Sequence, residues 1–437
     1  MAETTSAPGR ERRFHMPHPH LPHGLVAFPN RYRPWIEPWF FAYACLGVVQ
    51  GGMLPLLLPL SSGGSLEAGT IVGVMNLGGL SSPLWGHLAD HRRLHRQVLL
   101  FGMLATLAAL LLMPVQLGLP IKIALAALLG LGFAAANTVA NMFIVEVRPP
   151  EEWDARIGAL QALSGMGQVG GLLLAGLIGG RFALAFGVAA VMIATAIPLA
   201  WLTLRGVQVP IAVPRAAVVA HPPLGGEGWG GSLQRHFHLP TWGGCKMLLG
   251  RFRTPFMRLQ IFWFAAFMMI GAVMSMFPLA LVRTFGVGDG FPATTYAFAA
   301  GASLALYPTA VRLARAHGAH RLLRAGLMIR TVAIAMVAAA FLSGLHPVAL
   351  ASAGFVILVL TWPLLGVSGT VLSAQLCHGE KGEALGLFNA LTALSSAAGA
   401  FFGGCAMEVG GYGAVCVLGS VIVAIAAMWA TSDAKTA

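Results

Sequence analysis

The stretch that decides the fold is Gly86–Leu100, which reads Gly-His-Leu-Ala-Asp-His-Arg-Arg-Leu-His-Arg-Gln-Val-Leu-Leu. A long apolar segment runs into it and another runs out of it. Its polar part is so short that two membrane helices must turn back on each other here. Arg92, Arg93 and Arg96 crowd the turn, and short arginine-rich loops stay on the cytoplasmic side of a membrane. Asp90 lies in the last turn of the incoming helix.

This turn resembles the signature between the second and third helices of the major facilitator superfamily, which reads Gly, any residue, Leu, Ala, Asp, Arg, any residue, Gly, Arg, Arg. Gly86, Leu88, Ala89 and Asp90 match it, whereas His91 stands where Arg is usual and the loop is one residue longer. We expect Gly86 to leave room for a neighbouring helix. The resemblance implies that Asp90 locks the loop against the other half of the molecule in one transport state. The alternative is an ordinary positive-inside turn with a capping acid.

The composition is that of a membrane protein. Apolar residues make up 57% of the 437-residue chain and charged residues 10%, whereas a soluble protein carries about 25% charged residues. The net charge of +12 is spread over alternate loops, which argues against nucleic acid as a partner. The five cysteines lie singly, so neither a zinc site nor a disulfide framework is indicated. No nucleophile motif, phosphate loop or cofactor motif indicates an enzyme.

Hydropathy predicts an all-α membrane protein with twelve transmembrane helices, arranged as two pseudo-symmetric bundles of six. Residues 37–204 form the N-terminal bundle, 205–255 a cytoplasmic central loop and 256–431 the C-terminal bundle, between cytoplasmic tails at 1–36 and 432–437. The expected helices are 37–60, 66–88, 97–116, 121–146, 156–179, 183–204, 257–282, 292–313, 321–343, 347–373, 383–406 and 412–431.

The basic residues orient these helices. With both termini in the cytoplasm, 23 of the 27 Lys and Arg residues lie on the cytoplasmic side and three, Lys122, Arg181 and Arg283, on the other. Arg330 lies within a span. So lopsided a distribution over short loops predicts a multi-pass protein of the inner or plasma membrane with cytoplasmic termini.

The first 36 residues are polar, with His15, His18, His20 and His23 among prolines. They lack the apolar core of a secretory signal. We interpret them as a disordered cytoplasmic tail. Metal binding is the alternative, although proline prevents a regular helix from aligning these imidazoles.

The two halves repeat each other weakly in sequence. Setting Gly326 on Gly102 aligns the loops before the ninth and third helices, and the fifth and eleventh helices align with Gly171 opposite Gly399. Internal repeats are typical of transporters whose halves rock around a site at mid-membrane. The fifth helix also carries small residues at three- and four-residue spacings, which permits close helix contact in lipid.

The resemblance implies that helices one, four, seven and ten line a central cavity. Amides, indoles and methionines on these helices suit a neutral or weakly polar organic solute, and Pro363 offers a hinge in the tenth helix. The cavity candidates are Gln50, Asn137, Asn141, Gln260, Trp263, Met268, Met269, Met274, Met276, Thr361 and Trp362.

Two polar features of the spans admit alternatives. Asn137 and Asn141 lie four apart on one helical face and either hydrogen-bond a neighbouring helix or contact a solute. Arg330 either meets an anionic substrate or extends its side chain to the cytoplasmic surface, which we favour. No acid lies at mid-span, so proton coupling through a central carboxylate is not supported.

We therefore predict a monomeric secondary transporter of the drug-efflux-like branch that moves a small organic solute outward by alternating access. It would need the lipid bilayer but no cofactor or metal, and a proton is the candidate coupling ion. A nutrient importer of the same fold is one alternative. A transporter-shaped assembly or regulatory factor that carries no solute is another.

Overall fold

The protein is described by a computed structural model for residues 37–92, 94–115, 118–147, 150–204, 254–343, 347–376 and 381–429. All of them belong to one compact unit, Ile36–Ala437. The predicted tails at 1–36 and 432–437 lie outside the described residues, as does nearly all of the predicted central loop at 205–255. The described elements are all helices. This fits a membrane interior, where a helix satisfies its own backbone hydrogen bonds.

The first half of the chain forms six spans, two of which are built from shorter pieces. The first span contains a π-helical turn and the second a 3₁₀ turn. The elements are α1 (Pro38–Gly47), η1 (Val48–Met53), α2 (Leu54–Leu60), α3 (Ser65–Leu77), η2 (Gly78–Ser81), α4 (Ser82–Arg92), α5 (His95–Leu112), α6 (Leu119–Val147), α7 (Pro150–Ile178) and α8 (Phe182–Thr203).

The second half forms six more spans. The long element at the end of the chain is two helices, because Gly411 interrupts it with φ 74° and ψ 166°. The elements are α11 (Pro255–Phe285), α12 (Gly290–His317), α13 (Ala319–Ser343), α14 (Pro347–Leu360), α15 (Trp362–Leu376) and α16 (Lys381–Trp429).

The count of twelve predicted helices is confirmed. Ten helices are long and apolar enough to cross a membrane, and one of these is the double helix α16. The broken span of α3, η2 and α4 completes the set. The largest shift from prediction is in α7, which begins at Pro150 rather than at 156, because proline suits the first position of a helix.

Local signals in the sequence explain where helices begin and end. Thr254 caps α11 by accepting a hydrogen bond from the Met257 N–H at 3.3 Å, and Pro255 follows at the first helical position. The helix ends at Gly286, whose φ of 63° lies in the left-handed region that glycine adopts without strain. Gly179 and Gly318 mark two further helix ends with positive φ.

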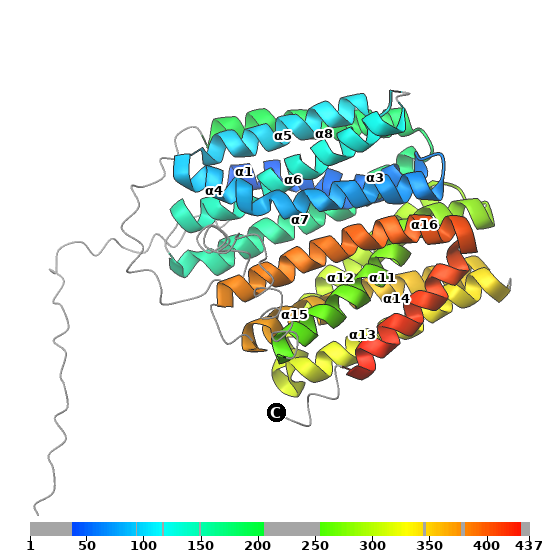
Figure 1. The fold of residues 1–437 in the computed structure, drawn as a ribbon. Coiled ribbons are helices and arrows are strands. Elements are labelled where there is room, and N and C mark those ends of the chain that lie inside the picture. Colours follow the sequence, from blue (N-terminus) through cyan, green and yellow to red (C-terminus); the bar gives the residue numbers. More distant parts are fainter. Residues whose placement is uncertain are drawn as a thin grey trace, which may run out of the picture. The chain divides into compact units, whose positions relative to one another are not determined.

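Each half buries its own apolar core, and Figure 1 shows the two bundles, blue to green and green to red. Large apolar side chains also remain exposed on the outside, such as Leu177 at 85% and Leu202 and Val332 at 60%. In water such a surface would be unfavourable, whereas in lipid it is the expected belt. The chain is therefore an integral, multi-pass membrane protein.

The two bundles are related helix by helix, as the weak sequence repeat predicted. Gly102 packs its helix on the Gly132 carbonyl in the fourth span, and the aligned Gly326 packs on Leu365 in the tenth. Gly171 packs against the Val48 carbonyl of the first span, and the aligned Gly399 packs in the same way against the seventh. The aligned glycines thus join equivalent pairs of helices.

The bundles meet along two equivalent pairs of helices, α3 with α16 and α7 with α12. We call the end of the bundles where Lys122, Gly180 and Gly286 lie the Lys122 end, and the opposite end the Arg96 end. Several contacts between bundles lie at the Lys122 end. Ser65 donates a short hydrogen bond to Glu408, and the Arg283 guanidinium donates to the Ser62 and Gly63 carbonyls at 3.3 and 3.0 Å. In this structure the bundles are closed against each other at that end.

Glycine makes the α3–α16 contact possible. A Cβ at Gly404 would lie 2.5 Å from the Ser65 carbonyl oxygen and 2.9 Å from the Gly69 Cα. A Cβ at Gly69 would likewise lie 2.5 Å from the Ala400 carbonyl oxygen. Since backbone atoms cannot yield, any side chain at either position forces the two helices apart.

We expect Gly404→Ala to destabilise the closed arrangement by about 1–3 kcal/mol, the usual cost of overpacking. The apparent melting temperature of the purified protein should fall by about a few degrees. Gly170→Ala is the matched control, because a Cβ at Gly170 meets nothing within 4 Å. Its melting temperature should hold or rise, since alanine favours helix. Equal effects of the two substitutions would contradict the close backbone contact.

Candidate functional site

The π-helical turn η1 gives the first bundle a polar centre. Gln50 lies within η1, and its Oε1 accepts a hydrogen bond from the Asn137 Nδ2 of α6 at 2.9 Å. π-Turns are rare and often occur at functional sites because they displace one residue from the regular helix. The turn places Gln50 beside Asn137, so the predicted candidates on the first and fourth spans come together.

The polar centre extends to a third span that the sequence analysis did not include. The Asn141 Nδ2 donates to the Asn137 carbonyl at 2.9 Å, and the Gln161 Nε2 of α7 approaches the Asn141 Oδ1 at 3.4 Å. Gln161 is exposed, whereas the two asparagines are half-buried. We call Gln50, Asn137, Asn141 and Gln161 the amide cluster.

Gln168 is a second amide of α7 whose position the sequence did not reveal. A Cβ at Gly51 would lie 3.1 Å from the Gln168 Cδ, so the Gln168 side chain lies directly against η1. Within the run Gly-Gln-Val-Gly-Gly, Gly167 and Gly171 pack against backbone carbonyls of the first span, and Gln168 presents its amide to the same span. The pair Gly51 and Gly52 was the available signal for the irregular turn.

Two candidates of the second bundle are core residues. Gln260 is 1% exposed and donates to the Ser373 Oγ at 3.3 Å. Trp263 is 4% exposed, donates from its indole N–H to the Thr392 Oγ1 at 2.8 Å and stacks on Phe267. These side chains contact their own bundle, so the expectation that they line an open cavity is wrong in this conformation. Met268 is half-buried beside them.

Trp362 is the candidate that the second bundle exposes, at 38%. It begins α15 directly after Thr361, where the tenth span is interrupted. Pro363 has no backbone N–H and cannot complete the helical hydrogen bonding, which accounts for the interruption at the place where a hinge was predicted. The Tyr307 side chain of α12 lies close to the Trp362 indole.

Arg330 contradicts the expectation that its side chain extends to the membrane surface. The residue is 0% exposed, and its Nε donates to the Thr361 Oγ1 at 3.0 Å. Its Cζ lies 5.6 Å from the ring centroids of both Phe267 and Trp362. The ninth span faces its own bundle at this position, so the guanidinium points inward instead of along the helix toward solvent.

The signature turn is only partly described. Asp90 and Arg92 end α4, but their side chains lie outside the described residues, and so does Arg93. Arg96 is half-buried, with its Cζ 5.2 Å from the Trp201 ring centroid. A Cβ at Gly86 would lie 3.7 Å from Thr138 Cγ2, an ordinary contact. The expected close helix approach at Gly86 is therefore absent from this conformation.

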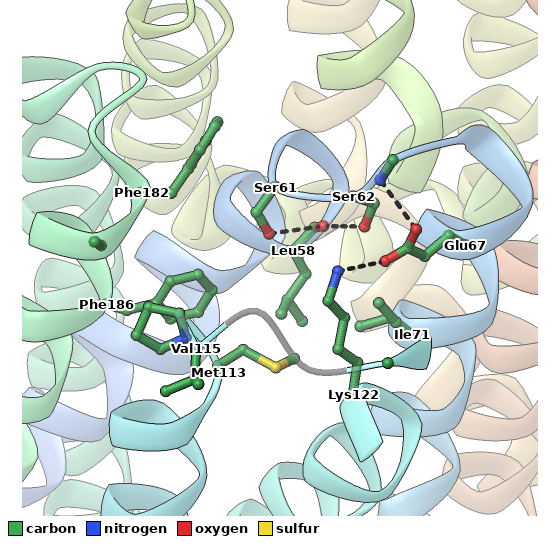
Figure 2. Close-up of a pocket in the computed structure, with 14 residues that line it drawn as sticks. Leu58, Ser61, Ser62, Glu67, Ile71, Met113, Val115, Lys122, Phe182 and Phe186 are labelled. Carbon is green, nitrogen blue, oxygen red and sulfur yellow. Dashed lines mark hydrogen bonds and ion pairs between the residues drawn. The ribbon is translucent and has the colours of Figure 1, made fainter. Parts of the chain in front are cut away.

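A pocket of about 610 Å³ lies at the Lys122 end of the first bundle. Figure 2 shows the Lys122 Nζ reaching the Glu67 carboxylate, at 2.7 Å, while the Gly63 N–H donates to the same carboxylate at 3.1 Å. The wall also carries Phe182 and Phe186. None of the predicted cavity residues lines it. The half-exposed ion pair holds the turn between the first two spans, a role worth about 0–1 kcal/mol.

Charged groups of the described spans lie mostly at helix ends. Glu37 precedes α1, and its carboxylate pairs with Arg156 of α7 at 2.7 Å. Among the described residues, no three His, Cys, Asp or Glu side chains gather as a metal site would require. Arg330 is the described exception, a charge deep within a span.

Comparison with known proteins places the chain in a large group of membrane proteins. The model of the Major Facilitator Superfamily matches residues 39–400. No curated protein matches the sequence. The fold is similar to a solved peptide transporter of the POT family in an autoinhibited form, at 15% identity and a TM-score of 0.69, covering 91% of this chain and 96% of that one.

Two further solved structures share the fold. The nucleoside transporter NupG is 12% identical with a TM-score of 0.65, covering 90% of this chain and 96% of that one. A D-xylose-proton symporter is 14% identical with a TM-score of 0.62, covering 90% and 94%. At such identities the likeness concerns the fold alone.

The hydrogen bond between Gln50 and Asn137 can be measured by a double-mutant cycle. We expect Gln50→Leu and Asn137→Ala to show a coupling of about 0.6 kcal/mol in the free energy of unfolding, the average for such bonds in membrane bundles. The pair Gln168→Leu with Asn137→Ala is the control and should be additive. If both pairs prove additive, the hydrogen bond between Gln50 and Asn137 does not contribute to stability.

Proposed function

Because the chain belongs to the major facilitator superfamily, we propose that it is a secondary active transporter, not an enzyme, that exports a small organic solute by alternating access. The observation that supports this most is the pair of interfaces between the bundles. At the Lys122 end, Gly69 meets Gly404 and Gly176 meets Gly290 through backbone atoms. Because no side chains interlock at such glycine contacts, two rigid bundles can move against each other there.

In this proposal, export requires the Lys122 end to open. Besides the glycine contacts, polar contacts help to hold it shut: Ser65 with Glu408, and Arg283 with two carbonyls. Each typical hydrogen bond contributes about 0.5–1.5 kcal/mol. A solute that binds the open and closed states with different affinity can therefore shift the equilibrium between them.

We propose that the solute contacts the amide cluster on one side and Trp362 on the other. The amides are half-buried or exposed, so they offer donors and acceptors without complete desolvation. The Trp362 indole supplies a flat apolar surface. Gln260 and Trp263 are left out of this site because their own bundle buries them.

The orientation rests on the positive-inside distribution, which puts the Arg96 end and both termini in the cytoplasm. In a background without the native cysteines, an impermeant thiol reagent added outside cells should label Val115→Cys and Gly288→Cys, both exposed at the Lys122 end. Gln97→Cys and His317→Cys, exposed at the Arg96 end, should stay unlabelled. The reverse pattern would invert the proposed topology.

We further propose that the protein works as a monomer and exports its solute as members of the drug-efflux-like branch do. The resemblance at Gly86–Asp90 supports it, and so do the amides and the indole of the candidate site, which suit an organic solute. A proton is the candidate coupling ion. Every described acidic side chain lies at a helix end, so a proton would have to be carried by groups other than a carboxylate at mid-span.

Flux in proteoliposomes tests the proposal, after a panel of solutes has been screened for thermal stabilisation of the purified protein. Wild-type protein should move the stabilising solute across the bilayer. We expect Asp90→Asn to bind it normally but to move it about tenfold more slowly, because a charge contact worth about 1–2 kcal/mol that favours one state is lost.

The outcomes separate the alternatives. Uptake rather than loss of labelled solute in cells would identify an importer. A partner that co-purifies in stoichiometric amount, with no flux of any stabilising solute, would indicate an assembly or regulatory factor and contradict the proposal. Full flux by Asp90→Asn would remove that residue from the conformational cycle.

A further inference from the structure

Arg330 carries more hydrogen-bonding capacity than its bundle uses. It lies near the middle of α13 with 0% exposure, and its Nε donates to the Thr361 hydroxyl. Its Nη1 and Nη2 have no hydrogen-bond partner among the described residues. A guanidinium has five N–H donors in a planar fork, so four of them are left unused.

The surroundings of Arg330 do not balance its charge. The ion pairs of the described residues, Glu37 and Glu152 with Arg156 and Glu67 with Lys122, all lie in the other bundle. Beside Arg330 stand two aromatic rings and the Thr361 hydroxyl. A buried charge without a counter-charge is costly inside a membrane, which marks such residues as functional candidates.

The aromatic rings cover only one side of the guanidinium. The Phe267 and Trp362 centroids each lie 5.6 Å from the Arg330 Cζ, and they lie 5.7 Å from each other. Rings on opposite faces of the guanidinium would be separated by about twice that distance, as stacking geometry requires. The three groups therefore form a triangle, and the Nη edge is not enclosed between the rings.

We propose that Arg330 binds the carboxylate of an organic anion and that Trp362 packs against the apolar body of that anion. This inference rests on the proposed transport function in one respect: the anion is taken to be the transported solute. A guanidinium fork matches a carboxylate in two parallel charge-assisted hydrogen bonds. The anion would supply both the missing charge and the missing acceptors.

Trp362 forms the entrance to this site. Its indole contacts Arg330 on the inner side while 38% of the residue is exposed. It stands at the break of the tenth span, close to Tyr307, which is itself 36% exposed. In this proposal, rotation of the Trp362 indole uncovers the guanidinium. Because Thr361 bonds Arg330 and stands at the same break, an anion on Arg330 also acts on the hinge.

Benzoate and benzamide test the proposal on the full-length purified protein in nanodiscs. The two have the same shape, but only benzoate is charged at neutral pH. Benzoate should raise the melting temperature and quench tryptophan fluorescence in a saturable way, and benzamide at the same concentration should do neither. Equal responses to the two compounds in the wild-type protein would overturn the proposal without any variant.

Variants locate the binding. Arg330→Gln should weaken benzoate binding at least tenfold, and Arg330→Lys, which keeps the charge but loses the fork, should fall between. Arg315→Gln, an exposed arginine of the same bundle, is the control and should bind like wild type. If Arg330→Gln does not fold, Trp362→Phe replaces it and should reduce the affinity for benzoate while leaving the response to benzamide unchanged. Wild-type benzoate affinity in Arg330→Lys and Trp362→Phe would contradict the assignment.

Chloride distinguishes an inorganic from an organic ligand. If chloride stabilises the protein as strongly as benzoate, Arg330 holds a structural ion, and the proposal is wrong. The binding assay needs no gradient, so it is independent of transport. Benzoate binding without any flux would overturn the proposed function and leave this inference standing, whereas flux of a neutral solute without benzoate binding would do the opposite.

Discussion

Close contact between helix backbones at glycine is the constraint on which this structure depends. Lipid solvates a leucine as well as another helix does, so helices in a membrane associate through packing and polar contacts instead of the hydrophobic effect. Gly171 and Gly399 bring helices together within each bundle, and Gly69 and Gly404 bring the two bundles together. The same chemistry fixes the bundles internally and lets their mutual interface slide.

The polar groups divide unequally between the bundles. In the first bundle, Asn137 donates to Gln50 across two helices and Asn141 donates to the Asn137 carbonyl within α6, all at moderate exposure. In the second, Arg330 is fully buried, and its Nη1 and Nη2 have no hydrogen-bond partner among the described residues. A transporter whose halves present different chemistry can hold two ends of one solute, an apolar or amide-bonding end and a charged end.

Much of the fold could be predicted from the sequence, because apolar length and basic loops constrain membrane helices strongly. The repeat was also readable, since Gly102 with Gly326 and Gly171 with Gly399 prove to join equivalent helix pairs. The candidate site was less predictable. Hydropathy reports that a helix spans the membrane but not how it is rotated, so the buried positions of Trp263 and Arg330 were missed. The π-turn at Gln50 depends on tertiary packing, so its only signal in the sequence is a Gly-Gly pair.

If the two bundles rock about the glycine interfaces, distances between spin labels at the two ends must change in opposite directions. One labelled pair is Leu66 with Val409 at the Lys122 end, and the other is Gln97 with Arg321 at the Arg96 end, all exposed. Arg283→Ala removes the hydrogen bonds to Ser62 and Gly63 that help to close the Lys122 end. We predict that this variant lengthens the first distance and shortens the second. Lengthening at one end with no change at the other would contradict rocking of rigid bundles.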